Sequence, residues 1–150
     1  MKKIRLLGMY YSPGYCDMLG GRHGTSLQKQ ESGEWVIVST ASEDHNSPTV
    51  TTTYSVLPEA LAEFETFLNK KKILSLSKRP KSDMFITDYS PWSYSFDYET
   101  TSFGKDKRSY CSFGEYLNYS KRDRELLDEL SKRFAGLYGE KLSETVEEDR

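Results

Sequence analysis

Apolar and polar residues alternate most strictly over residues 92–99. Trp92, Tyr94, Phe96 and Tyr98 occupy every second position, and the residues between them are serine or acidic. Because side chains alternate across a strand, this period of two predicts a half-buried strand whose inner face is aromatic. We assign Trp92 and Phe96 to the core. Alternation or β-branched content predicts further strands over residues 3–11, 25–30, 35–42, 49–56 and 107–113.

Glycine and proline separate these segments. Residues 31–34, Glu-Ser-Gly-Glu, predict a hairpin loop, and residues 103–106 predict a second turn. Residues 20–24 are rich in glycine, and we expect them to form a flexible connector. Residues 73–91 contain Pro80 and Pro91, and they are expected to be irregular.

Two segments have the apolar spacing of a helix. The first follows Pro58, a residue that suits the first helical position, and its apolar stripe comprises Leu57, Leu61, Phe64 and Leu68. The second begins near Ser120, where Ser-Lys-Arg-Asp resembles a capping box, and we expect it to stop at Gly139. Its apolar stripe comprises Leu126, Leu130, Phe134 and Leu137.

The predicted order is therefore four strands, a helix, two strands and a helix. This order is typical of an α+β fold in which two helices pack on one face of a mainly antiparallel sheet of about six strands. We expect a single domain over residues 1–142. Residues 143–150 are acidic, and we expect them to be a frayed tail.

The order of elements resembles that of small bacterial α+β proteins. The resemblance is carried by V-L-P-E-A-L-A-E-F-E-T-F-L, then K-I-L-S-L-S-K, then D-Y-S-P-W-S-Y-S-F-D-Y, and it covers roughly residues 35–135. In those proteins a helix after a strand meander precedes an Asp-x-x-x-Trp strand, a hairpin and a last helix. The resemblance implies a fold and no activity.

Composition narrows the classes of function. The 150 residues are 36% hydrophobic, and the longest apolar runs, such as Trp35-Val36-Ile37-Val38, are far too short to span a membrane. The first residues lack the apolar region of a signal peptide, so we expect a cytoplasmic protein without a membrane partner. Its 21 basic and 23 acidic residues give a net charge of -2, which argues against a nucleic-acid-binding protein.

Cys16 and His23 are the candidates for nucleophilic catalysis. They lie seven residues apart, and Asp17 or Asp44 could orient the histidine. No family signature surrounds Cys16, so we favour the alternative of a small thiol in a hairpin loop. Without a secretion signal, Cys16 and Cys111 are expected to be free thiols.

No segment of the sequence indicates a binding site for a cofactor or a metal. Residues 20–24 match neither pattern of phosphate-binding loop. Residues 43–46, Glu-Asp-His-Asn, offer oxygen and nitrogen ligands, but adjacent residues rarely converge on one ion. We therefore expect no bound metal and no cofactor.

Residues 70–81 form a basic run without an acidic residue. Together with an aromatic strand, this run could indicate a sheet that stacks nucleic-acid bases. No RNA-recognition signature such as R-G-F-G-F-V is present, and we favour a helix end followed by a solvated loop. The basic residues are Lys70, Lys71, Lys72, Lys78, Arg79 and Lys81.

Tyrosine is unusually frequent, with 11 in the chain. Tyr11, Tyr15 and Tyr89 flank Ser-Pro breaks outside the clear core patterns, and tyrosine is enriched at protein interfaces. We predict that these three residues form a surface that binds a protein partner or a second copy. The leading hypothesis is therefore a non-enzymatic protein-interaction module, with a Cys16/His23 enzyme and a nucleic-acid binder through residues 70–81 as alternatives.

Overall fold

The computed structural model of the chain describes residues 3–14, 20–44, 47–82 and 92–147. Within these ranges the helices are α1 (Pro58–Lys70), a short 3-10 helix η1 (Ile73–Lys78) and α2 (Lys121–Ala135). The strands are β1 (Ile4–Ser12), β2 (Gly20–Lys29), β3 (Trp35–Asp44), β4 (Thr49–Val56), β5 (Ser93–Ser102), β6 (Lys105–Gly114) and β7 (Tyr138–Glu147). The expected combination of an antiparallel sheet with helices is confirmed.

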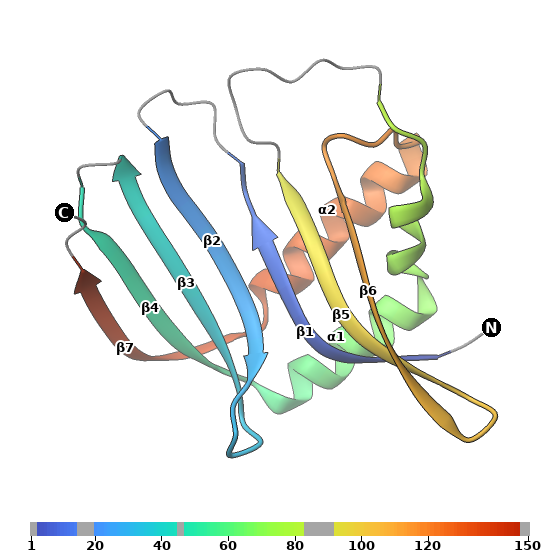
Figure 1. The fold of residues 1–150 in the computed structure, drawn as a ribbon, viewed down its shortest axis with the longest axis horizontal. Coiled ribbons are helices and arrows are strands. Elements are labelled where there is room, and N and C mark those ends of the chain that lie inside the picture. The colour runs from blue at the N-terminus through green and yellow to red at the C-terminus, as the bar shows by residue number, and fades with distance from the viewer. Residues whose placement is uncertain (1–2, 15–19, 45–46, 83–91, 148–150) are drawn as a thin grey trace.

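The strands form a 7-stranded sheet in the order β6-β5-β1-β2-β3-β4-β7 (Figure 1). Every neighbouring pair is antiparallel. The first four strands follow one another as a meander, and the later strands extend it at both sides. β5 pairs with β1 and β7 pairs with β4, so β6 and β7 are the two edge strands.

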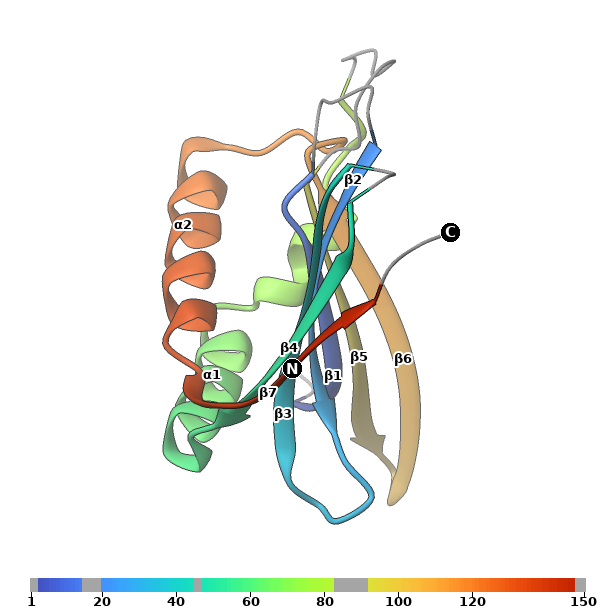
Figure 2. The same ribbon diagram turned by 90° about the vertical axis from the view of Figure 1, so that its left-hand side faces the viewer.

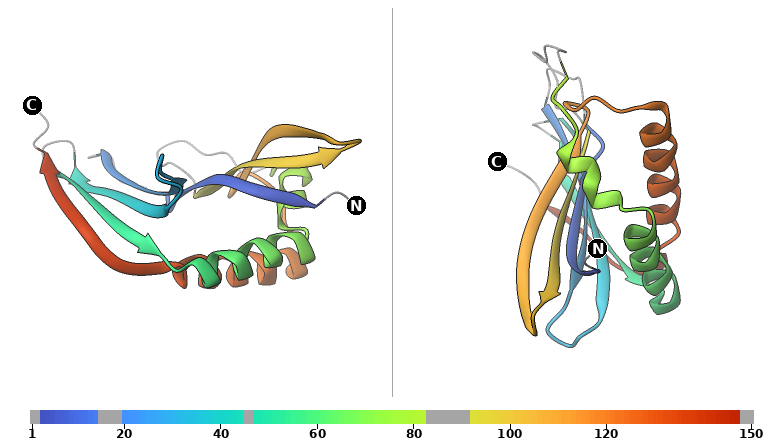
Figure 3. Two further views of the ribbon diagram at one scale, coloured as in Figure 1. Left: turned by 90° about the horizontal axis from the view of Figure 1, so that it is seen from below. Right: turned by 90° about the vertical axis from the view of Figure 1, so that its right-hand side faces the viewer.

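The helices lie on one face of the sheet, and no described helix packs on the other face (Figures 2 and 3). The apolar faces of the strands point toward α1, η1 and α2, where they form one core with the apolar stripes of those helices. Fully buried side chains in this core include Leu27, Ile37, Phe96 and Phe113 from the sheet and Phe64, Leu68, Ile73 and Leu130 from the helices.

The alternation in residues 92–98 produces the aromatic inner face of β5 as predicted. Phe96 is 0% exposed and Tyr94 is buried, whereas Trp92 and Tyr98 are partly buried. The ring of Phe96 packs against that of Phe113 on β6, with 5.6 Å between the ring centroids. The strand therefore contributes both core residues and rings that solvent can reach.

The capping box at Ser120 is confirmed. The backbone N–H of Asp123 donates to Ser120 Oγ at 3.1 Å, and the backbone N–H of Ser120 donates to Asp123 Oδ2 at 3.2 Å. Two of the N–H groups that a helix start leaves without an internal partner are thereby satisfied. This cap fixes the point at which the chain turns from β6 into α2.

The expected frayed tail was wrong for residues 143–147, because they belong to β7. This seventh strand pairs with β4 from Val56↔Tyr138 to Thr49↔Glu147. Gly139, expected to end the preceding helix, instead lies in the strand, and α2 ends at Ala135. A Cβ at Gly139 would lie 2.3 Å from Ser55 Oγ, so only glycine allows the two strands to approach here.

Three smaller expectations were also wrong. Residues 20–24 belong to β2 and pair with β3, so they are not a flexible connector. Residues 73–78 are not irregular but form η1, which places Ile73 and Leu76 in the core. Leu57 is not part of the buried stripe of α1, because it is the N-cap residue and its side chain is exposed.

Candidate functional site

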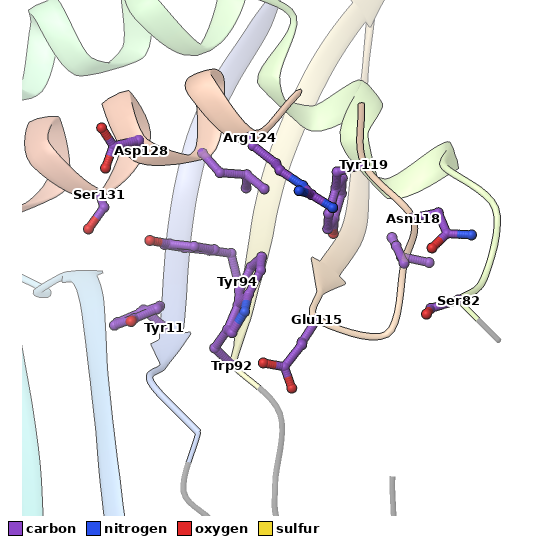
Figure 4. Close-up of a pocket in the computed structure, with 12 residues that line it drawn as sticks. Tyr11, Ser82, Trp92, Tyr94, Glu115, Asn118, Tyr119, Arg124, Asp128 and Ser131 are labelled. Atoms are coloured by element: carbon purple, nitrogen blue, oxygen red, sulfur yellow. The ribbon is translucent and has the colours of Figure 1, made fainter. Parts of the chain in front are cut away.

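A pocket of about 540 Å³ lies between α2 and the sheet, at the open end of the β5–β6 hairpin (Figure 4). Its walls come from segments that are distant in sequence: the end of β1, the start of β5, the connection from β6 to α2, and one face of α2. The residues from α2 are Arg124, Leu127, Asp128 and Ser131. Their spacing of three and four residues places them on one side of the helix.

Aromatic rings form the sheet side of the pocket. β1 and β5 pair in a register that places Tyr11 opposite Tyr94, and their rings stack with centroids 4.6 Å apart. Trp92 stacks on Tyr119 at 6.1 Å and meets the edge of Tyr94 at 6.0 Å. Such contacts add to the free energy of burial and hold the rings in fixed orientations.

The position of Tyr119 depends on a close approach of the backbone. Its hydroxyl donates a hydrogen bond of 2.6 Å to the carbonyl oxygen of Gly114. Gly114 itself has no room for a side chain, because a Cβ there would lie 2.4 Å from the carbonyl oxygen of Trp92. The glycine therefore lets β6 and the start of β5 come together beneath the Trp92–Tyr119 pair.

The tyrosine hydroxyls of the pocket remain neutral at physiological pH. The pKa of Tyr94 is raised to about 12, mainly by burial and also by the neighbouring Tyr11, while a hydrogen bond with Ser131 opposes the rise. Burial also raises the pKa values of Tyr11 and Tyr119. The pocket thus presents neutral hydroxyls and electron-rich ring faces rather than phenolates.

Charged groups stand on two sides of these rings. Figure 4 shows Arg124 and Asp128 on the helix side and Glu115 on the strand side. Asp128 forms an ion pair with Lys132 at 3.2 Å. Oε2 of Glu115 is buried and accepts no hydrogen bond from any described residue. A buried oxygen of this kind favours a hydrogen-bond donor or a cation beside it.

The row of rings continues beyond the pocket along the helix-facing side of the sheet. Tyr11 meets Phe134 of α2 at 6.3 Å, and Phe134 meets Tyr138 at 6.2 Å. Tyr138 in turn contacts Tyr54 on β4 at 5.0 Å. The tyrosine excess of the sequence therefore belongs in part to one connected aromatic row that links β5 to β7.

Only one of the three predicted recognition residues lies in the described part of the chain. Tyr11 lines the pocket, whereas Tyr15 and Tyr89 lie outside the described residues, so their meeting with Tyr11 stays a prediction. Cys16 also lies outside the described residues. His23 belongs to β2, pairs with Ala41 on β3 and is exposed.

The basic run of residues 70–81 is divided between structural and exposed residues. Arg79 donates to both oxygens of Asp123, through Nε at 2.8 Å and through Nη2 at 3.1 Å. It therefore fastens the segment after η1 to the start of α2. The lysines of the run are exposed.

The described residues contain neither a metal-binding cluster nor a helix that could span a membrane. No group of three or more histidine, cysteine, aspartate or glutamate residues there could hold a metal ion. None of its helices has the length and apolarity that a membrane crossing requires. Searches for similar family models, curated proteins and solved structures found no match.

Cys111 on β6 is expected to react slowly with alkylating agents. Burial raises the pKa of its thiol to about 11, against a smaller opposite effect of a hydrogen bond with Ser77. Only the thiolate is nucleophilic, so at pH 8 the folded protein should react about a hundredfold more slowly than an ordinary cysteine. In a Cys16→Ser variant, iodoacetamide labelling followed by mass spectrometry measures this rate directly. Labelling of Cys111 at equal rates in native and urea-unfolded protein would contradict the prediction.

Proposed function

We propose that the protein is a protein-interaction module whose aromatic pocket receives a basic side chain of its partner. The observation that carries the proposal is Oε2 of Glu115, which is buried and has no hydrogen-bond partner among the described residues, in a pocket that four aromatic rings also line. A carboxylate oxygen that is withdrawn from water loses hydration, and a cationic partner restores a favourable interaction.

The aromatic rings of the pocket also favour a cationic partner. A lysine or arginine side chain gains from the faces of tryptophan and tyrosine by about 0.5–2 kcal/mol, the larger value where water is excluded. Trp92 and Tyr119 are partly exposed rings of the same pocket and can supply such faces. The neutral tyrosine hydroxyls also offer hydrogen bonds without competing as charged groups.

The composition of the pocket matches that of an interface centre. Tryptophan, tyrosine and arginine dominate the binding energy of protein interfaces. All three residue types meet here, with Arg124 on the helix side and Trp92 on the sheet side. An aromatic pocket with a charged wall therefore gives one defined point at which a partner side chain enters.

A random peptide library displayed on phage tests the proposal. Selection on the wild-type protein is expected to enrich peptides with lysine or arginine next to an aromatic residue. Selection on Glu115→Gln is expected to lose this consensus, because the neutral amide no longer attracts a cation. Glu125→Gln, an exposed carboxylate on α2 outside the pocket, is the matched control and should retain the consensus.

Fluorescence of Trp92 gives the affinity of a selected peptide. The chain has two tryptophans, so Trp35→Phe leaves Trp92 as the only reporter. Its emission should change and saturate with the peptide, and Glu115→Gln should weaken binding about tenfold or more, the loss expected for one charged hydrogen bond. The absence of any consensus, or equal affinity in both variants, would refute the proposal.

A further inference from the structure

The β5–β6 hairpin ends in an exposed phenylalanine. Its two-residue connection is Phe103-Gly104, and both residues have positive φ, 55° and 76°. This is the mirror-image turn that suits a twisted hairpin, in which asparagine usually precedes glycine. A phenylalanine at this position is strained, and its side chain is wholly exposed.

Folding of the chain gains nothing from the ring of Phe103. The ring is exposed to solvent, and the turn geometry would be more favourable with asparagine. Exposed aromatic side chains of this kind serve as anchors when they enter a pocket on another molecule. The tip of the hairpin therefore presents Phe103 as a side chain that can anchor the chain to another molecule.

Two exposed lysines lie next to Phe103 in the sequence. Lys105 and Lys107 on β6 are exposed and form no ion pair within the described residues. Arg108 is already bound to Asp97, with Nε donating to Oδ1 at 3.0 Å. The tip thus combines one aromatic ring with two unpaired ammonium groups, the side-chain chemistry that the aromatic pocket favours.

The anchor and the pocket stand at opposite ends of the same hairpin. Ser102↔Lys105 is the last pair at the tip, and Ser93↔Gly114 is the last pair at the open end. Trp92 and Glu115 of the pocket directly adjoin that second pair. Each strand has 10 residues, so the two features are about 33 Å apart along the hairpin at ~3.3 Å per residue.

We propose that the partner of the aromatic pocket is a second copy of this chain. The ring of Phe103 enters the pocket of the other copy near Trp92, and the ammonium group of Lys105 pairs with Oε2 of Glu115. This inference rests on the proposed function, because it uses the same pocket and the same carboxylate.

An antiparallel arrangement of two hairpins about a two-fold axis forms both contacts at once. Each tip then reaches the open end of the other hairpin, and every contact occurs twice. β6 is an edge strand, so no other strand of the sheet stands between the hairpin and a second copy. The result is a closed dimer rather than an open chain.

Sedimentation equilibrium across a range of protein concentrations tests the inference. The wild-type chain of 17.3 kDa is expected to approach twice that mass. Phe103→Asn removes the anchor while suiting the turn, so it should fold at least as stably and dissociate at least tenfold more readily. Glu115→Gln should weaken the dimer similarly. Leu142→Asn changes an exposed apolar residue on β7, at the other edge of the sheet, and should leave the dimer unchanged.

A mixture of Phe103→Asn and Glu115→Gln chains tests reciprocity. In the mixed pair one tip–pocket contact is complete, and the other has lost both the ring of Phe103 and the charge of Glu115. The mixed pair thus loses one ring and one charge, whereas each variant dimer loses two of one kind, so its affinity should lie between those of the two variant dimers. A dimer that tolerates Phe103→Asn, or an open-ended assembly, would overturn the inference. So would a monomer at all concentrations, or a monomer that binds anionic vesicles through Phe103. If the peptide selection nevertheless yields its basic consensus, the proposed function stands and only the identity of the partner fails.

Discussion

Replacing Phe96 with alanine is expected to lower the free energy of unfolding by about 3–5 kcal/mol. The side chain is 0% exposed, and its ring packs between Tyr94 and Phe113 in the core. Alanine would leave a cavity on the helix-facing side of β5 and β6, because the hydrogen-bonded strands cannot move to fill it. Since domains of this size are stable by only about 5–15 kcal/mol, the variant should be close to unfolding.

Urea denaturation followed by circular dichroism measures this loss. Phe103→Ala is the matched control, because it removes the same side chain from the same hairpin at a wholly exposed position. At concentrations where the chain is monomeric, its free energy of unfolding should stay within about 0.5 kcal/mol of wild type. Equal stability of the two alanine variants would show that Phe96 is not a core residue.

The aromatic core of β5 was predictable because its signal is local. Alternating residues of one strand lie on one face whatever the rest of the chain does, so the pattern put Tyr94 and Phe96 on the same face, and Phe96 was assigned to the core. The same locality predicted α2, whose apolar stripe and capping box are contained in one continuous segment. These features needed no knowledge of which strands pair.

β7 could not be recognised from such a pattern. Apart from its first two residues, every residue of this edge strand is exposed, so nothing selects apolar residues at alternate positions. Glutamate and lysine there protect an edge strand from unwanted pairing, yet in a sequence they are typical of a solvated tail. The position of β7 depends on β4, with which it pairs from residue 49 to residue 56.

The pocket was also hidden from sequence reasoning, except for Tyr11. Trp92 was assigned to the core, and it does pack against the core as a partly buried ring, but it also lines the pocket. No pattern in the sequence marked Glu115 as a candidate functional residue. Its position follows from the pairing of Ser93 with Gly114, which brings the residue after β6 next to the residue before β5. Only tertiary structure could therefore combine the carboxylate with the rings.

The second large effect is expected at Asp123 on the first turn of α2. Asp123 is 5% exposed, and its carboxylate accepts hydrogen bonds from Arg79 and from the backbone N–H of Ser120. The Arg79 hydrogen bond is the main cause that holds the pKa of Asp123 below its usual value. Burial opposes this effect, and the bond from Ser120 supports it.

Asp123→Asn is expected to lower the free energy of unfolding by about 1.5–3 kcal/mol at pH 7. This is the range for a hydrogen bond to a charged group. Breaking a fully buried ion pair costs about 3–5 kcal/mol, but the side chain of Arg79 is 36% exposed and water can still hydrate its charge. Asparagine also keeps an oxygen that can accept from Ser120, so the smaller range applies.

The loss of stability caused by Asp123→Asn should become smaller at low pH. The pKa of Asp123 is lower in the folded state than the value of about 3.9 in the unfolded chain. Its contribution is therefore complete above the unfolded value and is lost as the pH falls through the folded value. The difference in stability between wild type and Asp123→Asn should be constant from about pH 7 to pH 5 and should shrink below about pH 4.

Asp128→Asn provides the control on the same helix. Asp128 is 69% exposed, and it pairs with Lys132 at the surface, a contact worth about 0–1 kcal/mol. Urea unfolding of both variants at pH 7, 5 and 3 separates the two roles. If both substitutions cost the same, or if the Asp123→Asn difference persists unchanged at pH 3, the Arg79–Asp123 pair does not fasten α2 to the segment that follows η1.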